Sequence, residues 1–290
     1  MRFHRIYVEL SNICGLKCSF CPSRTLQSCV ISLEMFDSII SQAKHYTSEI
    51  ACHIMGDPLT LSNLNKYLDI IKKHNLKSII TTSGFFIPNH TYDTLFHPSI
   101  KQINISLNSY NKNETNLSFD EYITPIINLC KAKLNKNPDM FINLRLWNLD
   151  SHMSEQKYNN LIFERLSKEF DISLNLDEIY NKSTKSIRVD YKILLHFDEY
   201  FQWPALSNPI YGDGKCLGLK SHIGILCNGV VVPCCLDDKG IINLGNIKTQ
   251  SLDEILNAKR AIDIKRGFEK GKAVEELCQR CSYKDRFILD

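Results

Sequence analysis

The sequence has no run of apolar residues long enough to span a bilayer, and its first residues, Met1 to Leu10, lack the long apolar stretch of a signal peptide. The sequence also lacks a large excess of charge of either sign, because the formal net charge is only +3 on 290 residues. So small an excess does not indicate a nucleic acid or a membrane as partner. We find no internal repeat and no low-complexity segment. These absences predict a cytoplasmic globular protein.

Up to residue 205, short β-rich runs alternate with amphipathic helical runs. The predicted strands are Arg5–Leu10, Glu49–Met55, Ser78–Thr82, Gln102–Asn108, Phe141–Trp147 and Ile172–Leu176. The predicted helices are Leu33–Tyr46, Leu61–Asn75, Phe119–Leu134 and Glu155–Phe170. Regular βα alternation implies parallel strands joined by right-handed crossovers. About six such units are fewer than the eight of a closed barrel. We therefore predict an α/β fold, a partial (β/α)6 TIM-like barrel over residues 1–205.

Two of the predicted strands are polar at every second position. These polar residues are Asn104, Ser106 and Asn108 on one strand, and Asn143, Arg145 and Trp147 on the next. A strand of a parallel sheet that is covered on both faces should be nearly all apolar. A solvated edge would explain one such strand. A polar interior that binds a ligand explains both, and we favour it.

The composition of the sequence changes after Trp203-Pro204, where turn-forming residues follow one another at short intervals. We expect short strands at Ile223–Leu226, Val230–Val232 and Ile241–Leu244, and then a helix at Leu252–Arg266. We interpret residues 206–290 as a small second domain. Domains of this size often need a metal or a cluster for stability.

The chain contains 12 cysteines, and in a reducing cytosol they favour metal or cluster ligation over disulfides. Cys14, Cys18 and Cys21 follow the first predicted strand with C-x3-C-x2-C spacing. Three thiolates on one [4Fe–4S] cluster leave one iron with an open coordination site. Zinc needs a fourth ligand and usually takes C-x2-C pairs, so this spacing suits it poorly.

The segment Cys14-Gly-Leu-Lys-Cys18-Ser-Phe-Cys21 resembles the signature of the radical SAM superfamily. The resemblance implies a [4Fe–4S] cluster that binds S-adenosylmethionine (SAM) at its open iron. Gly56-Asp57-Pro58-Leu59 is similar to the family's Gly-Gly-Glu-like segment, whose backbone holds the SAM amino group, although Met55 replaces the first glycine. The same resemblance puts Phe20 near the adenine and Ser106 and Asn108 near the ribose. Arg145 suits the SAM carboxylate, since a guanidinium binds carboxylates in bidentate geometry.

The C-terminal cysteines form the pattern Cys216-x12-Gly229-x4-Cys234, followed later by Cys278-x2-Cys281. This pattern resembles the SPASM domain, an auxiliary-cluster module, in a shortened form near the single-cluster "twitch" variant. The resemblance implies that Cys216, Cys234, Cys278 and Cys281 hold a second [4Fe–4S] cluster. Cys235 remains an alternative to its neighbour Cys234. A structural zinc site with four thiolates is the alternative for the whole set.

The family resemblance implies that SAM is cleaved reductively to a 5′-deoxyadenosyl radical, which abstracts hydrogen from a substrate carbon. A fully ligated auxiliary cluster would then accept an electron, giving a net oxidation. The short second domain favours a small-molecule substrate, and a peptide- or protein-modifying maturase is the alternative. The resemblance also implies a reductant such as flavodoxin or ferredoxin. A non-catalytic iron–sulfur or zinc protein is the alternative from another class. No residue is assigned to the substrate chemistry.

Overall fold

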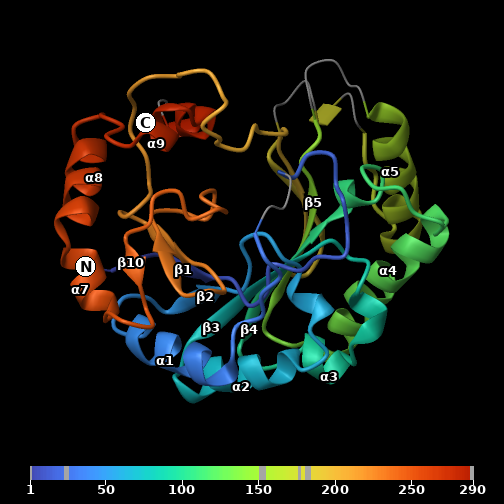
Figure 1. The fold of residues 1–290 in the computed structure, drawn as a ribbon. Helices are drawn as coiled ribbons and strands as arrows, with labels where there is room; N and C mark the ends of the chain where they lie inside the picture. Colours follow the sequence, from blue (N-terminus) through green and yellow to red (C-terminus); the bar gives the residue numbers. More distant parts are fainter. Residues whose placement is uncertain (1, 23–25, 150–154, 176–177, 180–183, 288–290) are drawn as a thin grey trace. The chain divides into compact units, whose positions relative to one another are not determined.

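The computed structural model describes residues 2–22, 26–149, 155–175, 178–179 and 184–287. The chain divides into two compact units. Unit 1 comprises Met1–Gly15, Cys21–Ile79 and Phe201–Asp290, and unit 2 comprises Leu16–Phe20 and Ile80–Tyr200. Each unit combines helices with a sheet in which parallel pairings dominate (Figure 1). Within the described residues, no helix is long and apolar enough to cross a membrane.

The sheet of unit 1 joins the two ends of the sequence. Strand β1 (Arg5–Val8) pairs in parallel with β2 (Glu49–Ala51), which pairs in parallel with β3 (Lys77–Thr82). On its other side, β1 pairs in parallel with β8 (His222–Ile225). Two short antiparallel strands, β9 (Val230–Val232) and β10 (Gly245–Asn246), complete this side. The cysteine-rich C-terminal segment is thus part of the sheet that contains the first strand.

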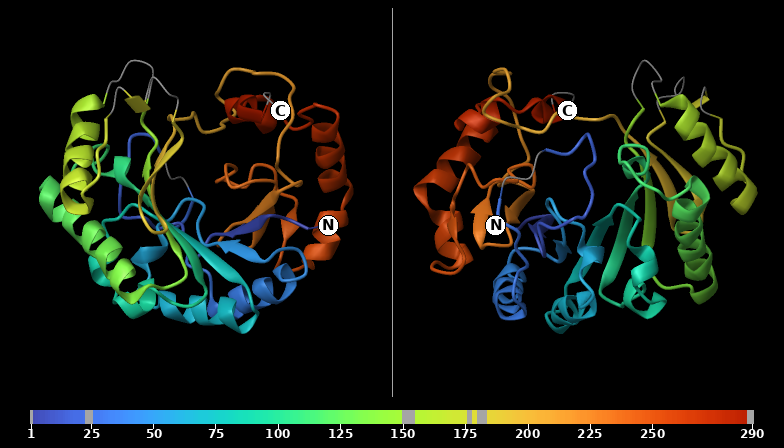
Figure 2. Two further views of the ribbon diagram at one scale, coloured as in Figure 1. Left: turned by 180° about the vertical axis from the view of Figure 1, so that it is seen from behind. Right: turned by 45° about the vertical axis from the view of Figure 1, so that its right-hand side comes forward.

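Two groups of helices belong to unit 1. Helices α1 (Leu33–Ala43) and α2 (Leu64–Lys73) lie side by side and bury their apolar faces (Figures 1 and 2). Between them Phe36 and Tyr67 make an edge-to-face contact at 5.3 Å. The C-terminal helices are α7 (Leu252–Asn257), α8 (Lys259–Glu269) and α9 (Glu276–Gln279). Short 3₁₀ helices lie at η1 (Pro58–Thr60) and η4 (Ser282–Phe287).

Unit 2 is built on three parallel strands, β4 (Ile100–Ser106), β5 (Phe141–Leu146) and β7 (Ile193–Phe197). Strand β6 (Ser186–Asp190) pairs antiparallel with β7. Ile103 and Ile105 of β4 are fully buried, as are the alternate residues Ile142, Leu144 and Leu146 of β5. Asn104 lies on the opposite face and is also fully buried. Its side chain hydrogen-bonds with Thr81 and Asn143. The polar face of these strands is therefore interior, as expected from the alternation.

The remaining elements of unit 2 connect these strands. They are the helices α3 (Tyr92–Leu95), α4 (Phe119–Lys136) and α5 (Gln156–Phe170), and the 3₁₀ helices η2 (Ile87–Asn89) and η3 (Leu107–Ser109). Helix α4 starts at a capping box, in which the side chains of Ser118 and Glu121 each accept the backbone N–H of the other residue. Helix α5 ends at Asp171, which adopts a left-handed conformation with φ +51°.

Three local predictions are wrong. Ile172–Asn175 form no strand and are not buried, and Leu176, the last residue of that prediction, lies outside the described residues. The sixth core strand is β7, which supplies the buried alternation that residues 172–175 lack. Ile241–Leu244 are not a strand either, because β10 begins at Gly245. The helix predicted at 252–266 is divided at Ala258, whose extended backbone separates α7 from α8. The domain boundary between residues 205 and 206 stays a prediction.

Candidate active site and cluster sites

The three N-terminal cysteines lie on the segment that follows β1, and each is half-buried. Cys14 and Cys21 belong to unit 1, and Cys18 belongs to unit 2. Their positions after a parallel strand put them where α/β folds usually carry their chemistry.

Gly56 lies directly against the backbone that precedes Cys14. A Cβ at this position would stand 1.7 Å from the carbonyl oxygen of Ser11 and 2.9 Å from that of Ile13. The neighbouring Asp57 N–H donates to the carbonyl of Ile13 at 3.1 Å. The predicted SAM-binding segment and the segment leading to the first cysteine are thus in backbone contact, and only glycine fits at the crossing point.

Asp57 and Pro58 are both buried. The carboxylate of Asp57 accepts the N–H of Leu59 at 3.0 Å and caps η1, which begins at Pro58. The side chain of Asp57 therefore shapes the segment. The backbone contact of this segment with the SAM amino group stays a prediction.

Glu9, which our sequence analysis did not single out, is only 1% exposed. Its carboxylate accepts the backbone N–H of Met55 at 3.1 Å and that of Cys227 at 3.2 Å. Hydrogen bonds to a carboxylate are among the stronger ones, and losing a buried partner is costly. Glu9 thus joins β1 both to the segment around Gly56 and to the end of β8. The sequence offered one hint of this role, since Glu9 is a charged residue between the apolar residues Val8 and Leu10 of the first predicted strand.

In unit 2, Phe20 stacks on Tyr200 with the ring centroids 5.4 Å apart. Burial and the nearby Glu155 carboxylate raise the pKa of Tyr200, and its hydroxyl also hydrogen-bonds with Asn108. Two predicted SAM contacts, Phe20 and Asn108, are therefore linked through one tyrosine. Asn108 is buried in η3 directly after β4.

The other predicted contacts of unit 2 form a row across its sheet. Ser106 on β4 is in register with Arg145 on β5, which is in register with His196 on β7. The guanidinium of Arg145 stacks on Trp147 at 4.6 Å, and the Trp147 indole donates to His196 at 3.2 Å. Burial and the positive charge of Arg145 lower the pKa of His196. A neutral imidazole beside a guanidinium makes this row suited to an anionic group.

The four C-terminal cysteines of the predicted second cluster all belong to unit 1. Burial raises the pKa of each of these thiols. The neighbouring thiols Cys235, Cys216 and Cys278 raise the pKa of Cys234 further, and Cys216 and Cys281 raise that of Cys278. The structure thus gathers them closely enough for their charges to interact. Within the described part of the chain, however, no three Cys, His, Asp or Glu side chains are placed to hold a single metal ion.

A buried lysine supports the fit of an anionic group here. Lys284 is 2% exposed, and its ammonium donates to the carbonyl oxygens of Cys278 at 3.2 Å and Cys281 at 2.7 Å. A buried cation is costly unless a negative charge offsets it. Four thiolates on an iron–sulfur cluster would supply that charge. The residues present therefore fit a [4Fe–4S] group at Cys216, Cys234, Cys278 and Cys281.

Cys235 also interacts with Cys216, but its other neighbours differ from those of Cys234. It packs against the apolar cluster of Ile54, Leu226 and Val232. Burial raises the pKa of Cys235 to about 11, and its thiol hydrogen-bonds with Tyr7. These contacts favour Cys234 as the ligand and Cys235 as a core residue.

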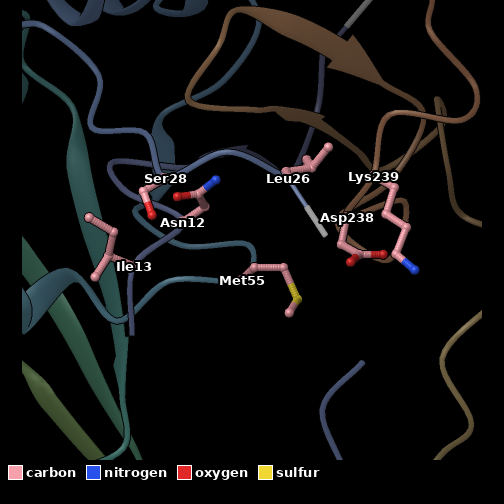
Figure 3. A pocket seen from close by; sticks show the side chains of 7 residues that line it. All are labelled: Asn12, Ile13, Leu26, Ser28, Met55, Asp238 and Lys239. Atoms are coloured by element: carbon pink, nitrogen blue, oxygen red, sulfur yellow. The ribbon is translucent and has the colours of Figure 1, made fainter. Parts of the chain in front are cut away.

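A cavity of about 120 Å³ lies in unit 1 beside the segments that precede Cys14 and Gly56. Its lining residues are Asn12, Ile13, Leu26, Ser28, Met55, Asp238 and Lys239 (Figure 3). Asp238 is only 8% exposed, and burial raises its pKa to about 6. The cavity therefore places an ionisable carboxylate beside apolar side chains.

We expect Asp238→Asn to stabilise the protein at neutral pH. Because the folded-state pKa of about 6 lies above the usual aspartate value of 3.8, the wild type loses stability as pH rises through this interval. The loss is at most about 3 kcal/mol. Thermal unfolding should show a higher melting temperature for the variant at about pH 8, with a smaller difference at about pH 5. Asp93→Asn, at a side chain that is 92% exposed, is the control, and an equal shift there would contradict the prediction.

Two family models match the chain. Residues 8–145 match the radical SAM superfamily, and residues 216–282 match SPASM, an iron–sulfur cluster-binding domain. The chain therefore belongs to the radical SAM superfamily and carries a SPASM domain after its radical SAM domain. Its cofactors are a [4Fe–4S] cluster with SAM and auxiliary iron–sulfur. This assignment favours an enzyme over the non-catalytic metal protein and iron–sulfur over zinc.

The individual proteins to which the chain is similar share little sequence identity with it or match only part of it. The chain is 30% identical over 115 residues to GTP 3′,8-cyclase of Synechocystis sp. (strain ATCC 27184 / PCC 6803 / Kazusa), a match that covers 38% of this chain and only 35% of that protein. BtrN in complex with AdoMet and 2-DOIA has a TM-score of 0.63 at 15% identity, covering 97% of this chain and 94% of BtrN. SuiB of Streptococcus suis bound to S-adenosylmethionine has a TM-score of 0.60 at 15% identity, covering 99% and 74%. At such identities the likeness shows the fold, and it confirms the predicted partial TIM-like barrel.

Proposed function

We propose that this chain cleaves SAM reductively and oxidises a small molecule by removing hydrogen from one of its carbon atoms. When bound, SAM and the [4Fe–4S] cluster supply the 5′-deoxyadenosyl radical for that step, and an auxiliary cluster can accept an electron. The observation that carries the proposal is the grouping of four half-buried cysteines, Cys216, Cys234, Cys278 and Cys281, beside the buried Lys284, whose ammonium donates to the backbone carbonyls of Cys278 and Cys281. A second, fully ligated cluster suits a net oxidation better than a redox-neutral rearrangement.

The chain's own residues have three tasks in this proposal. Cys14, Cys18 and Cys21 ligate the first cluster, while the backbone of Gly56, Asp57 and Pro58 receives the SAM amino group. In unit 2, Phe20, Ser106, Asn108 and Arg145 bind adenine, ribose and carboxylate. The row Ser106, Arg145 and His196 supports the last assignment because it offers hydrogen bonds and one positive charge on an interior face.

The test is the formation of 5′-deoxyadenosine from SAM by anaerobically reconstituted protein with a strong reductant, in the wild type and in Cys18→Ala. We expect turnover in the wild type and none in the variant. A wild-type protein that binds no iron, or a variant that keeps full turnover, would overturn the proposal. The matched control is Cys29→Ser, because the proposal assigns Cys29 to neither cluster.

A peptide-modifying reaction is the second candidate, because related folds were solved as SuiB bound to precursor peptide SuiA and as anSMEcpe with a Cp18Cys peptide. The two candidates differ in what stimulates 5′-deoxyadenosine formation. We expect the low-molecular-weight filtrate of a cell extract to stimulate it, and peptidase treatment of that filtrate to leave the effect intact. Loss of the stimulation on peptidase treatment would favour the peptide candidate.

A further inference from the structure

The segment that carries Cys18 is fastened to the turn after η3 by one side chain, Asn113. The Asn113 amide accepts the backbone N–H of Lys17 at 2.7 Å. Its NH₂ group donates to the sulfur of Cys18 at 2.9 Å and to the carbonyl of Ser109 at 2.7 Å. A further backbone bond runs from the N–H of Ser19 to the carbonyl of Lys112 at 3.1 Å. All these residues belong to unit 2.

The orientation of the Asn113 amide follows from its neighbours. The N–H of Lys17 can only donate, so the amide oxygen must face it. The carbonyl of Ser109 can only accept, so the NH₂ group must face that side. The same NH₂ group therefore presents a proton to Cys18. A flipped amide would lose both backbone hydrogen bonds.

The turn that carries Asn113 is itself held by a buried carboxylate. Glu155 is 9% exposed and pairs with Lys112, while Asn111 and Asn148 donate to it at 2.8 and 2.6 Å. Burial opposes the charge of Glu155, but hydrogen bonds from Lys112, Asn111 and Asn148 outweigh it and lower its pKa. Glu155 thus holds Asn111 and Lys112 in place, and the next residue, Asn113, contacts Cys18.

We propose that Asn113 is a positioning residue for the first cluster. Asn113 holds the Cys18 segment in place and donates an N–H to the Cys18 sulfur. The inference rests on the proposed function, because it needs Cys18 to be a cluster ligand. A donor at a ligand sulfur stabilises the reduced cluster, which carries more negative charge. Asn113 therefore makes the first cluster easier to reduce.

The experiment is a reductive titration of the full-length reconstituted protein without SAM, monitored by electron paramagnetic resonance, with iron content measured in parallel. The signal of the first cluster is identified afterwards by its change when SAM is added. The variants are Asn113→Ala, which removes both functions, and Asn113→Asp, which keeps the acceptor for Lys17 but replaces the N–H donor by a negative charge. The control is Thr115→Ala on the same loop, at a side chain whose hydroxyl accepts the N–H of Leu117 at 3.2 Å.

We expect Asn113→Ala to shift the equilibrium about tenfold towards the oxidised cluster, which is about 59 mV for one electron. Asn113→Asp should shift it further, and Thr115→Ala should match the wild type. Loss of first-cluster iron in Asn113→Ala, with Asn113→Asp still loaded, also supports the positioning role, since only the aspartate keeps the Lys17 contact. Wild-type potential and iron in both Asn113 variants would overturn the inference. Full iron in Cys18→Ala would instead overturn the ligand assignment beneath it.

Discussion

Gly56→Ala is expected to abolish 5′-deoxyadenosine formation and to remove the iron of the first cluster. The added Cβ would stand 1.7 Å from the Ser11 carbonyl oxygen and 2.6 Å from its carbonyl carbon. Both atoms are backbone, so the segment that leads to Cys14 must move as a whole. Overpacking a well-packed site typically costs about 1–3 kcal/mol, and a clash with two backbone atoms should cost more. Iron content, 5′-deoxyadenosine yield and the melting temperature measure the effect.

Gly271→Ala is the matched control for this prediction. Gly271 has nothing within 4 Å of an added Cβ, but its φ of +71° still penalises alanine. We therefore expect a loss of about 1–2 kcal/mol in stability with normal iron and turnover. A Gly56→Ala protein with full iron and wild-type yield would show that the contact between Gly56 and Ser11 does not matter for the cluster.

Cys234→Ser is expected to lose the second cluster, whereas Cys235→Ser should keep it. Both thiols interact with Cys216, but only Cys234 also interacts with Cys278, while Cys235 contacts Tyr7 and an apolar cluster. A chain with two [4Fe–4S] clusters holds about eight iron atoms, and the Cys234 variant should hold about four. Iron and sulfide analysis measures this, and zinc analysis of the same samples tests the alternative metal.

The two cysteine variants control for each other, because they alter neighbouring residues in the same way. Equal iron loss in both would mean that the segment is disturbed in general. Iron loss in Cys235→Ser alone would reverse the assignment of the ligand. The first cluster is checked in each protein by its formation of 5′-deoxyadenosine.

The sequence was sufficient for the features that depend on neighbouring residues. The buried strands β1 to β5 were predicted to within four residues at their ends, since their apolar runs are local patterns. The cysteine spacings likewise carried both family assignments. Strand β7 was missed because it forms a hairpin with β6, whose tight connection contains Lys192 at φ +56° rather than glycine.

The supporting residues could not be found in the same way. Asn113 contacts Cys18 across 95 positions, and Glu9 contacts Cys227 across 218. No periodicity or spacing rule connects residues so far apart, and asparagine in a turn is ordinary. Lys284 reads as a solvated charge until the fold buries it beside Cys278 and Cys281. These contacts exist only once the chain is assembled.

The parallel pairing of β1 with β8 limits how the protein can be shortened. Removing the residues after 205 would strip β1 of its neighbour along Arg5 to Val8. Ile6 and Val8, both fully buried, would then lie on an open strand edge. Exposed apolar edges recruit other chains and drive aggregation. A truncated radical SAM domain of this protein should therefore precipitate, even though it keeps Cys14, Cys18 and Cys21.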